Sequence, residues 1–521
     1  MDLPEILNRL QISGETEAPS PSLLPGPPVA TVLSQIQELL QAGKSSKTKE
    51  DILQDVMRLF ETADSLWLFS SCCHSEGPDL GKVYVGFTGT LVQYAALPHC
   101  ETDSGELCES WYSSVPGKAC TVAGVLLRLV RRLGASNVVL PCGSTAAPVR
   151  SLVRKLLPPV FVFSAAHVQG LPWTDAQSEL AARELLAASV QTAGCETLTE
   201  LLCGKTSGDD EGILGPVLEL LKPEMQKETW KLNQATKHVF SWTLIQVSRP
   251  WLCSYLDWVF PPSLLISDDY RTENKVLGVH CLHHIVLNVP AAALRQFNRA
   301  QVLYHALFNH LYTPEAQLIQ AVLPCLLDLL SVLEKPPQKA GDPRKATRYD
   351  EVLRLVLTHM EMEHKIPLRR VYARNIPPFI DRLGILIVRH LKRLERVIVG
   401  YLEVYDGPEE VARLYTLQAL ENTIQHAWPR MASRLDVLVK SLLRLIYDVC
   451  TDCSPTPQAV KEDLLQRAAH CLILLHRCCD HELQTVLAGV HSTCPEARVL
   501  ECIEKIQQDV RRQEANVEWS N

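Results

Sequence analysis

Cysteine and histidine residues gather near the C-terminal end of the chain. Two residues separate Cys450 from Cys453, and further thiols and imidazoles follow at His470, Cys471, His476, Cys478, Cys479 and His481. Groups of this kind at such spacing can bind a structural zinc ion. However, Cys471 begins an apolar run, and the segment has the pattern of one continuous helix. We therefore favour buried thiols and surface histidines over a metal site.

Other candidate chemical motifs are incomplete. His280 and His284 have the spacing of a zinc-protease pair, but Cys281 stands where that motif requires glutamate. The segment 204–207 resembles the end of a phosphate-binding loop, but Thr199 replaces the required upstream glycine. No nucleophile elbow, dinucleotide fingerprint or EF-hand loop occurs in the sequence. The sequence therefore predicts a protein that is not an enzyme and has no cofactor.

Composition indicates a folded protein without an affinity for polyanions. Hydrophobic residues make up 46% and charged residues 21% of the 521 residues, and the formal net charge is -8. This balance favours binding neither to nucleic acid nor to acidic membranes. The most apolar run, Ala321–Leu333, is too short to span a bilayer. The N-terminus lacks the basic start of a signal peptide, and many cysteines lie in apolar runs. We expect a reducing, cytoplasmic and nuclear location.

Apolar residues with helical spacing dominate the chain after Ala119. One example places five apolar side chains on one helical face between Leu391 and Tyr405, and Gly407-Pro408 then interrupts it. The next two runs span 411–424 and 435–449. Connections are short, which favours antiparallel neighbours. Helix pairs recur about every 40 to 47 residues, the period of HEAT or armadillo units. The predicted fold is an all-α solenoid of degenerate HEAT/armadillo-like helix pairs.

The Pro-, Gly- and Ser-rich segments that interrupt these runs predict the organisation of the chain. Residues 1–28 comprise a short helix and a Pro/Ser-rich linker, and 29–333 form an N-terminal helical-repeat part. That part contains a loop-rich insertion near 70–118, in which Lys82–Phe87 is compatible with a strand and one helix is expected near Leu91–Leu97. A linker at 334–348 precedes a C-terminal helical-repeat part at 349–512 and a tail at 513–521.

A stripe of basic residues marks the segment 365–400. Helical spacing places its arginine and lysine side chains outside the core, and Pro377-Pro378 suggests a rigid turn that presents nearby polar groups. Arginine is favoured at interfaces because its planar fork pairs with carboxylates. A solvated ridge is the alternative. The predicted partner-binding residues are Arg369, Arg370, Tyr372, Asn375, Arg389, Lys392, Arg393 and Arg396.

Several long strings resemble one protein family. They are Pro158–Phe163, Lys237–Leu244, Ile266–Pro290, Asn309–Glu315 and Arg369–Glu410, the last including Tyr401–Pro408. Together they resemble the vertebrate Tel-two-interacting protein two family, the smallest members of the TTT (Triple T) complex. The resemblance covers roughly 158–475 and is specific, because the strings are long and match no general motif.

The resemblance implies an α-solenoid without enzyme activity. It implies an adaptor that works with the other two TTT subunits, and indirectly with the heat-shock-ninety chaperone machinery. Its clients would be the phosphatidylinositol-3-kinase-related kinases, among them mTOR, ATM, ATR and the DNA-dependent kinase. A role in their folding, stability and assembly would link the chain to DNA-damage signalling.

Two other functions are compatible with the residue patterns. An importin-like helical-repeat transport adaptor would bind a Ran-type GTPase, whereas a zinc-dependent enzyme would contain stoichiometric metal. A scaffold that holds protein partners in register agrees with both the helical pattern and the resemblance.

Overall fold

A computed structural model describes residues 27–42, 46–69, 80–101, 107–139, 146–205, 212–334, 345–479 and 482–518. Within these ranges the regular elements are α-helices and short 3-10 helices, without a strand. The predicted all-α class is confirmed. The chain forms two compact units, an N-terminal unit (Met1–Ile266) and a C-terminal unit (Ser267–Asn521).

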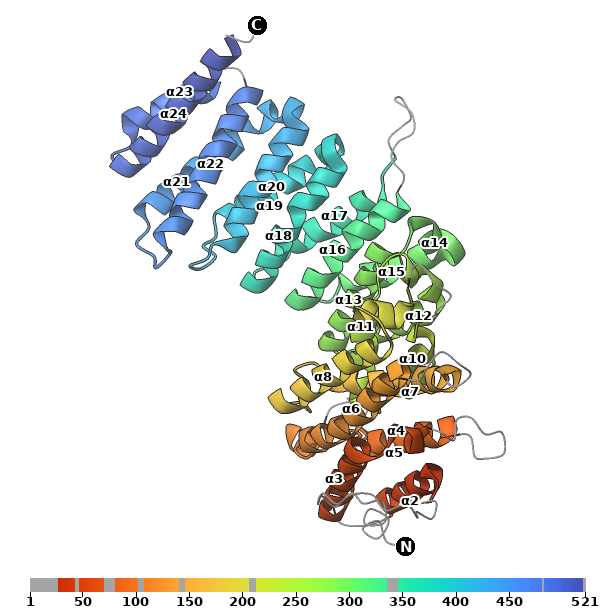
Figure 1. Ribbon diagram of the computed structural model, residues 1–521. Coiled ribbons are helices and arrows are strands. Elements are labelled where there is room, and N and C mark those ends of the chain that lie inside the picture. Colours follow the sequence, from red (N-terminus) through yellow and green to blue (C-terminus); the bar gives the residue numbers. More distant parts are fainter. Residues whose placement is uncertain are drawn as a thin grey trace. The chain divides into compact units, whose positions relative to one another are not determined.

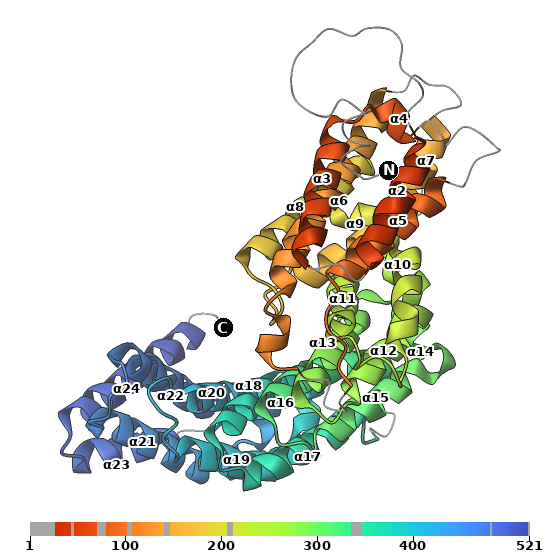
Figure 2. The same cartoon turned by 90° about the horizontal axis from the view of Figure 1, so that it is seen from below.

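The N-terminal unit consists of helices of very unequal length. They are α2 (Val29–Gln41), α3 (Ser46–Thr62), α4 (Ser65–Phe69), α5 (Leu80–Tyr94), α6 (Val115–Val139), α7 (Ala146–His167), α8 (Ala176–Thr192), α9 (Leu198–Cys203), α10 (Leu214–Leu221), α11 (Gln234–Ile245) and α12 (Leu256–Ser267). Helix α6 packs on α3 and α8, and α7 packs on α5, α8 and α11. Figure 2 shows α2 beside α5 and α3 beside α6.

Helix α5 corrects the predicted loop-rich insertion. The strand-compatible segment Lys82–Phe87 is helical, and the helix expected near 91–97 begins earlier, at Leu80. Tyr84, Phe87 and Leu91 are buried on one helical face. A Cβ at Gly86 would lie 3.0 Å from Nε2 of Gln37, at the end of a flexible side chain of α2. Packing against α2 and α7 thus outweighs the low helix propensity of the glycines and β-branched residues.

The C-terminal unit is more regular. Its helices are α13 (Thr272–Asn288), α14 (Ala291–Arg295), α15 (Arg299–His310), α16 (Ala316–Leu333), α17 (Arg348–Met362), α18 (Ile366–Leu383), α19 (Leu391–Leu402), α20 (Val411–Ala427), α21 (Leu435–Thr451), α22 (Gln458–Cys478), α23 (Glu482–Thr493) and α24 (Ala497–Glu518). The three runs expected between 391 and 449 correspond to α19, α20 and α21.

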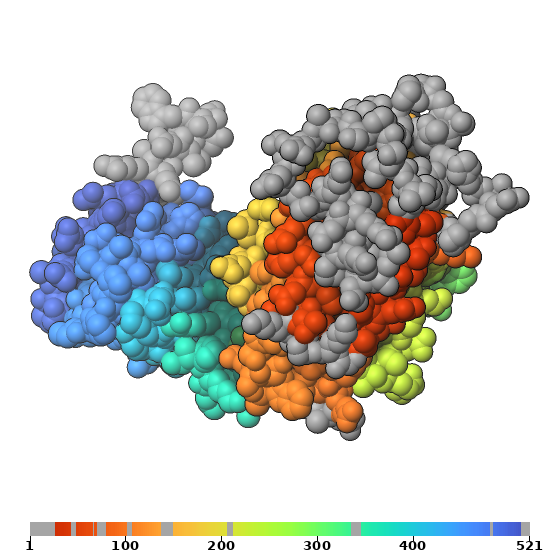
Figure 3. All heavy atoms as spheres, turned by 60° about the horizontal axis from the view of Figure 1, so that its bottom comes forward, coloured from red at the N-terminus to blue at the C-terminus, as the bar shows by residue number. Residues whose placement is uncertain are grey.

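These helices form two rows. Helices α16, α18, α20, α22 and α24 pack in that order, and α17, α19 and α21 form a second row beside them. Each member of the second row pairs with the helix that follows it in the chain (Figure 1). The helices of the first row begin at residues 316, 366, 411, 458 and 497. The spacing between these starts is close to the expected repeat length. The solenoid prediction is confirmed by this packing. Figure 3 shows the side chains of the C-terminal residues, in blue, adjoining one another on the face in view.

Helix α16 lies at the centre of this packing. Its 18 residues are the one described helix long and apolar enough to cross a membrane. It packs instead against α13, α15 and α18, which bury Leu318, Val322, Leu326 and Leu329 completely. Asp328 accepts a hydrogen bond from Nε2 of His283 on α13 at 2.9 Å. An apolar face that neighbouring helices bury is typical of a core helix.

The division of the chain differs from the predicted one. The boundary between the two compact units lies after Ile266 in the sequence. The helices on either side of the expected linker 334–348, α16 and α17, belong to the same unit. Arg348 at the start of α17 pairs with Glu334 at the end of α16 at 3.2 Å. Residues 335–344, and 1–26 with the expected first helix, lie outside the described residues. Helix α24 continues through Glu518, into the expected tail.

Candidate functional site: the loop edge of the C-terminal unit

The connections within the helix pairs of the C-terminal unit lie next to one another. We call the segments 311–315, 363–365, 403–410 and 452–457 the loop edge; they follow α15, α17, α19 and α21. The hydroxyls of Tyr405 and Thr456, from the last two segments, are 3.4 Å apart. Figure 1 shows these two connections side by side.

Large apolar side chains are exposed along the loop edge and at the helix ends beside it. The exposed fraction is 63% for Tyr312, 74% for Met362, 45% for Val404 and 41% for Tyr405. Tyr312 and His359 lie in contact, with ring centroids 6.1 Å apart. Exposed aromatic and methionine side chains are costly in water and typical of protein-contact surfaces. The loop edge is therefore the candidate site for binding another protein.

Arg370 determines the conformation of the connection between α19 and α20. Its Nε donates to both carboxylate oxygens of Asp406, at 3.0 and 3.1 Å, and its Nη2 donates to Glu409 at 3.0 Å and to the carbonyl of Asp406. Asp406 also accepts the backbone N–H of Ala412 at 2.7 Å. Its side chain is only 4% exposed, so the charge of Arg370 compensates a carboxylate removed from water.

Arg369 joins the same two helix pairs through the backbone. Its guanidinium donates to the carbonyls of Glu363 and Gly400 at 3.2 and 3.1 Å. The guanidinium carbon lies 3.8 Å from the centre of the Tyr401 ring, a cation–π geometry. Two neighbouring members of the predicted basic stripe thus stabilise the loop edge from within the chain.

Arg389 contributes to a buried polar cluster at the start of α17. Its Nη1 donates to Oδ2 of Asp350 at 3.0 Å, and Nε2 of His390 lies 2.8 Å from Oδ1. Thr347 donates its backbone N–H to Asp350 at 2.8 Å, forming the capping box of α17. Burial alone would raise the pKa of Asp350, but the hydrogen bonds from Thr347 and His390 and the charge of Arg389 together lower it below its ordinary value.

The remaining basic members of the stripe lie on α19. Arg393 donates to both carboxylate oxygens of Glu361, at 3.2 and 2.8 Å, and to the hydroxyl of Thr358. Lys392 and Arg396 are exposed. The sequence predicted a stripe of cations facing outward, whereas four of its arginines contact carboxylates or carbonyls of this chain.

Tyr372 and Asn375 require a correction. They are 2% and 8% exposed, so they cannot be presented to a partner. Pro377 and Pro378 lie inside α18 and do not form the expected turn, which leaves both side chains on the buried face of that helix. Burial raises the pKa of Tyr372 to about 12. Asn375 donates to the carbonyl of Val371 at 2.8 Å.

Sequence reasoning missed the acidic partners of the stripe. Asp350, Glu361 and Asp406 are each more than 30 residues from their arginine and come from a neighbouring helix or loop. Periodicity within one helix carries no information on such pairs. The spacing Thr347-x-x-Asp350 was the one available signal, because it has the form of a helix-start capping box.

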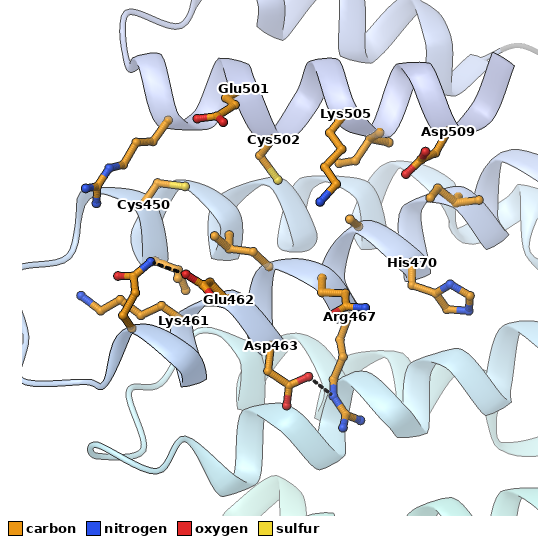
Figure 4. A pocket seen from close by; sticks show the side chains of 18 of the residues that line it. Cys450, Lys461, Glu462, Asp463, Arg467, His470, Glu501, Cys502, Lys505 and Asp509 are labelled. Atoms are coloured by element: carbon orange, nitrogen blue, oxygen red, sulfur yellow. Dashed lines mark hydrogen bonds and ion pairs between the residues drawn. The ribbon is translucent and has the colours of Figure 1, made fainter. Parts of the chain in front are cut away.

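A polar groove of about 1170 Å³ lies between α22 and α24, with residues of α20 and α21 at its sides. Figure 4 shows Cys450 and Cys502 among side chains of both charge signs. Asp463 accepts from Arg467 at 2.9 Å, and Glu421 pairs with His470 at 3.3 Å. Burial raises the pKa of Cys502 to about 11, which keeps the thiol protonated at neutral pH. This arrangement favours polar contacts over thiol chemistry.

The cysteine and histidine residues near the C-terminus do not converge. Helix α22 is continuous from Gln458 to Cys478, and the thiol of Cys471 points to the carbonyl of Leu417 on α20 at 3.6 Å. Cys453 is exposed in the connection before α22. Among the described residues, which exclude His481, no group of three potential ligands has the geometry of a metal site.

The other histidines singled out in the sequence lie on α13. His283 pairs with Asp328, and His284 lies 3.4 Å from the amide of Asn288 on the same helix. Burial and the proximity of His283 lower the pKa of His280. Buried thiols also lie in this core: burial raises the pKa of Cys281 on α13 to about 12, and burial also raises the pKa of Cys325 on α16.

Comparison with known proteins gives close relatives over nearly the whole chain. The chain is 49% identical over 471 residues to TELO2-interacting protein 2 of Homo sapiens, covering 89% of this chain and 90% of that one. It is 46% identical over 492 residues to TELO2-interacting protein 2 of Mus musculus, covering 92% and 93%.

Solved structures are only distantly similar. A crystal structure of importin beta shares 12% sequence identity, with a TM-score of 0.46, over 92% of this chain and 57% of that one. This likeness is too low to carry a functional assignment. The sequence profile of the Tti2 family matches residues 217–406, which include the whole basic stripe and the first half of the connection after α19. From this match and the identity to full-length relatives, we conclude that the chain belongs to the Tti2 family.

Proposed function

We propose that the chain is a non-enzymatic scaffold subunit of the TTT complex that binds a TELO2 protein. The carrying observation is the 49% identity, over about nine-tenths of both chains, to a protein named for its interaction with TELO2. On this proposal the chain helps chaperone-dependent folding and assembly of phosphatidylinositol-3-kinase-related kinases, and acts in the cytoplasm and nucleus.

The geometry of the C-terminal unit supports a scaffold. Stacked helix pairs present a long surface whose stability is local, which suits assembly with other elongated proteins. The thiols of Cys281, Cys325 and Cys471 are buried in the packing of helices, and burial raises the pKa of each, so they serve as core residues.

We propose the loop edge as the partner surface. Tyr312, Met362 and Tyr405 expose apolar area that a partner would cover, and Arg369 and Arg370 hold the intervening connections in place. Lys392 and Arg396, which are exposed on α19, remain proposed contacts for acidic groups of a partner. The other arginines of the stripe act by positioning these segments.

Affinity purification tests the function. The tagged full-length chain, expressed in cells, is expected to co-purify TELO2 and the third TTT subunit, and its depletion is expected to lower the amount of the kinases. Recovery of GTP-loaded Ran in place of these proteins would instead support a transport adaptor. Absence of TELO2 from the purified material would refute the proposal.

A paired variant tests the surface. Tyr312→Glu with Met362→Glu places two negative charges on the loop edge. This variant is expected to weaken TELO2 binding at least tenfold, because binding would remove the new carboxylates from water and the apolar contacts would be lost. Val302→Glu with Val437→Glu is the control, since both valines are exposed, at 49% and 46%, outside the loop edge. Equal binding by the two variants would exclude the loop edge as the TELO2 surface.

A further inference from the structure

A small hollow opens on the loop edge where two connections meet. It measures about 380 Å³ and lies between the segment after α19 and the segment between α21 and α22. Its lining includes Glu403, Tyr405, Glu410, Arg413, Asp448 and Asp452. The hydrogen bonds of Arg370 to Asp406 fix the first of these connections, and therefore the position of Tyr405 and Glu410.

The floor of the hollow contains a buried ion pair with unused hydrogen-bonding capacity. The side chains of Glu410 and Arg413 are 2% and 7% exposed and approach each other to 3.3 Å. Oε2 of Glu410 and Nε of Arg413 have no hydrogen-bond partner among the described residues. A buried unsatisfied polar atom costs about 1–3 kcal/mol, so a hydrogen-bond donor that reaches Oε2 of Glu410 would be stabilised there, whereas Nε of Arg413 is itself a donor and needs an acceptor.

The backbone at this position is also unfavourable. Glu410 has a φ of 48°, in the left-handed region, at the residue before α20. This conformation costs a residue with a side chain about 1–2 kcal/mol. Strain at a non-glycine residue is common at binding sites, where the surrounding structure holds it in place. Here it aims the carboxylate of Glu410 into the lining of the hollow.

The charge around the hollow is predominantly negative. Four carboxylates line it, from Glu403, Glu410, Asp448 and Asp452, against two cations, Arg413 and Lys461. Lys461 pairs with Asp452 at 3.6 Å. Arg444, which is 61% exposed, pairs with Glu403 at 3.1 Å and approaches Asp448 at 4.0 Å from outside the lining.

An aromatic ring completes the lining. Tyr405 is 41% exposed, and its hydroxyl is held near that of Thr456. Carboxylates beside an exposed aromatic ring form the environment in which guanidinium and ammonium groups bind, through charge-assisted hydrogen bonds and cation–π contact. A guanidinium carries five N–H donors in a planar fork, so it can donate to more than one carboxylate.

We propose that this hollow binds a cationic side chain, arginine in the first place, presented by a protein partner. The inference deepens the proposed function, on which it rests for the identity of that partner as a TTT subunit. The incoming cation would contact Glu410 on the floor, Tyr405 on the wall, and Glu403 and Asp448 at the rim. Arg444 would compete with it for the two rim carboxylates.

A small probe tests the site without a partner protein. The full-length chain is titrated with N-acetyl-Gly-Arg-Gly-amide and with the same peptide carrying neutral citrulline, and binding is followed by saturation-transfer NMR. Transfer to the arginine peptide is expected to exceed that to the citrulline peptide at least fivefold. Glu403→Gln with Asp448→Asn is expected to abolish the difference. Equal transfer to both peptides by the wild-type chain would overturn the proposal.

Affinity for the other two TTT subunits provides the second test. The rim variant Glu403→Gln with Asp448→Asn is expected to weaken binding about tenfold, in the range of charge pairs at interfaces. Arg444→Gln is expected to strengthen binding, because it frees the same carboxylates. Glu273→Gln with Asp436→Asn is the control, since it removes two exposed negative charges outside both the loop edge and the lining of the hollow.

The outcomes separate the two proposals. If the wild-type chain binds the TTT subunits and the rim variant binds equally well, the cation site is refuted and the scaffold function stands. If the wild-type chain binds neither subunit, the scaffold function fails and the peptide titration alone decides the site. Glu410→Gln, with helicity checked by circular dichroism, is expected to lose the response to the arginine peptide. Retention of that response in the folded variant would overturn the role of Glu410.

Discussion

Arg370 contacts both the side chain and the backbone of Asp406, across two helix pairs. Replacing it by methionine keeps much of the apolar stem but leaves the carboxylate of Asp406, 4% exposed, without its cation. Arg370→Met is therefore expected to destabilise the C-terminal unit by about 2 kcal/mol. Thermal unfolding and amide exchange across 403–411 measure the effect. Arg396→Met, at an exposed position of α19, is the control and should change neither.

Asp350 makes the stability of the same unit dependent on pH. Its folded pKa is lowered, so the folded state binds fewer protons than the unfolded chain. The stabilisation is complete above the ordinary carboxyl pKa of about 4 and is lost as the pH falls through the lower folded value. Asp350→Asn is expected to be less stable than the wild-type chain at pH 7, with the difference shrinking below pH about 4. Urea midpoints over this range check it; a constant difference would contradict it.

Particular residues show which features of the structure could be predicted from the sequence. The apolar spacing in 391–449 predicted α19, α20 and α21, because burial of one face and helical period coincide there. The burial of Tyr372 and Asn375 could not be predicted in this way, since two prolines suggested a turn and α18 nevertheless continues through them. The partners of Arg370 and Arg389 come from other helix pairs, and only packing brings them together.

At the scale of elements, the connection between α19 and α20 depends on one glycine. Gly407 has a φ of 84°, and a Cβ there would lie 3.2 Å from Nη2 of Arg370. Gly407→Ala is expected to destabilise the fold by about 1–2 kcal/mol. Gly400→Ala should have the opposite sign, because its Cβ would meet no atom within 4 Å inside helix α19. Chemical denaturation of both variants tests the pair, and equal signs would exclude this explanation.

Helix α5 shows why elements in the N-terminal unit were harder to predict. Its glycines and β-branched residues weaken local helix propensity, and its buried face is recognisable only once α2 and α7 are in place. The proposed cation site could likewise not be predicted from the sequence. Its carboxylates come from both ends of the connection between α19 and α20, from α21 and from the connection after α21. The left-handed backbone of Glu410 has no signature in residue type.

At the scale of the whole molecule, stability is expected to be local. Helices α23 and α24 pack only on each other and on α21 and α22 among the elements with extensive contacts. A chain ending at Cys479 is therefore expected to keep native amide protection in α16 and α18 and to lose it mainly in α22. Hydrogen exchange with mass spectrometry measures this pattern. Loss of protection throughout the C-terminal unit would show global cooperativity instead.

The buried thiols can be used to measure how often neighbouring helices separate. Cys281, Cys325 and Cys471 are at most 1% exposed, and burial raises the pKa of each. An alkylating reagent reacts with thiolate in contact with water, so each sulfur is modified only when its helix separates from its neighbours. Timed alkylation followed by peptide mass spectrometry would then order these separations along the chain. If partner binding restrains the C-terminal unit, the label should enter Cys471 more slowly in the assembled complex than in the free protein.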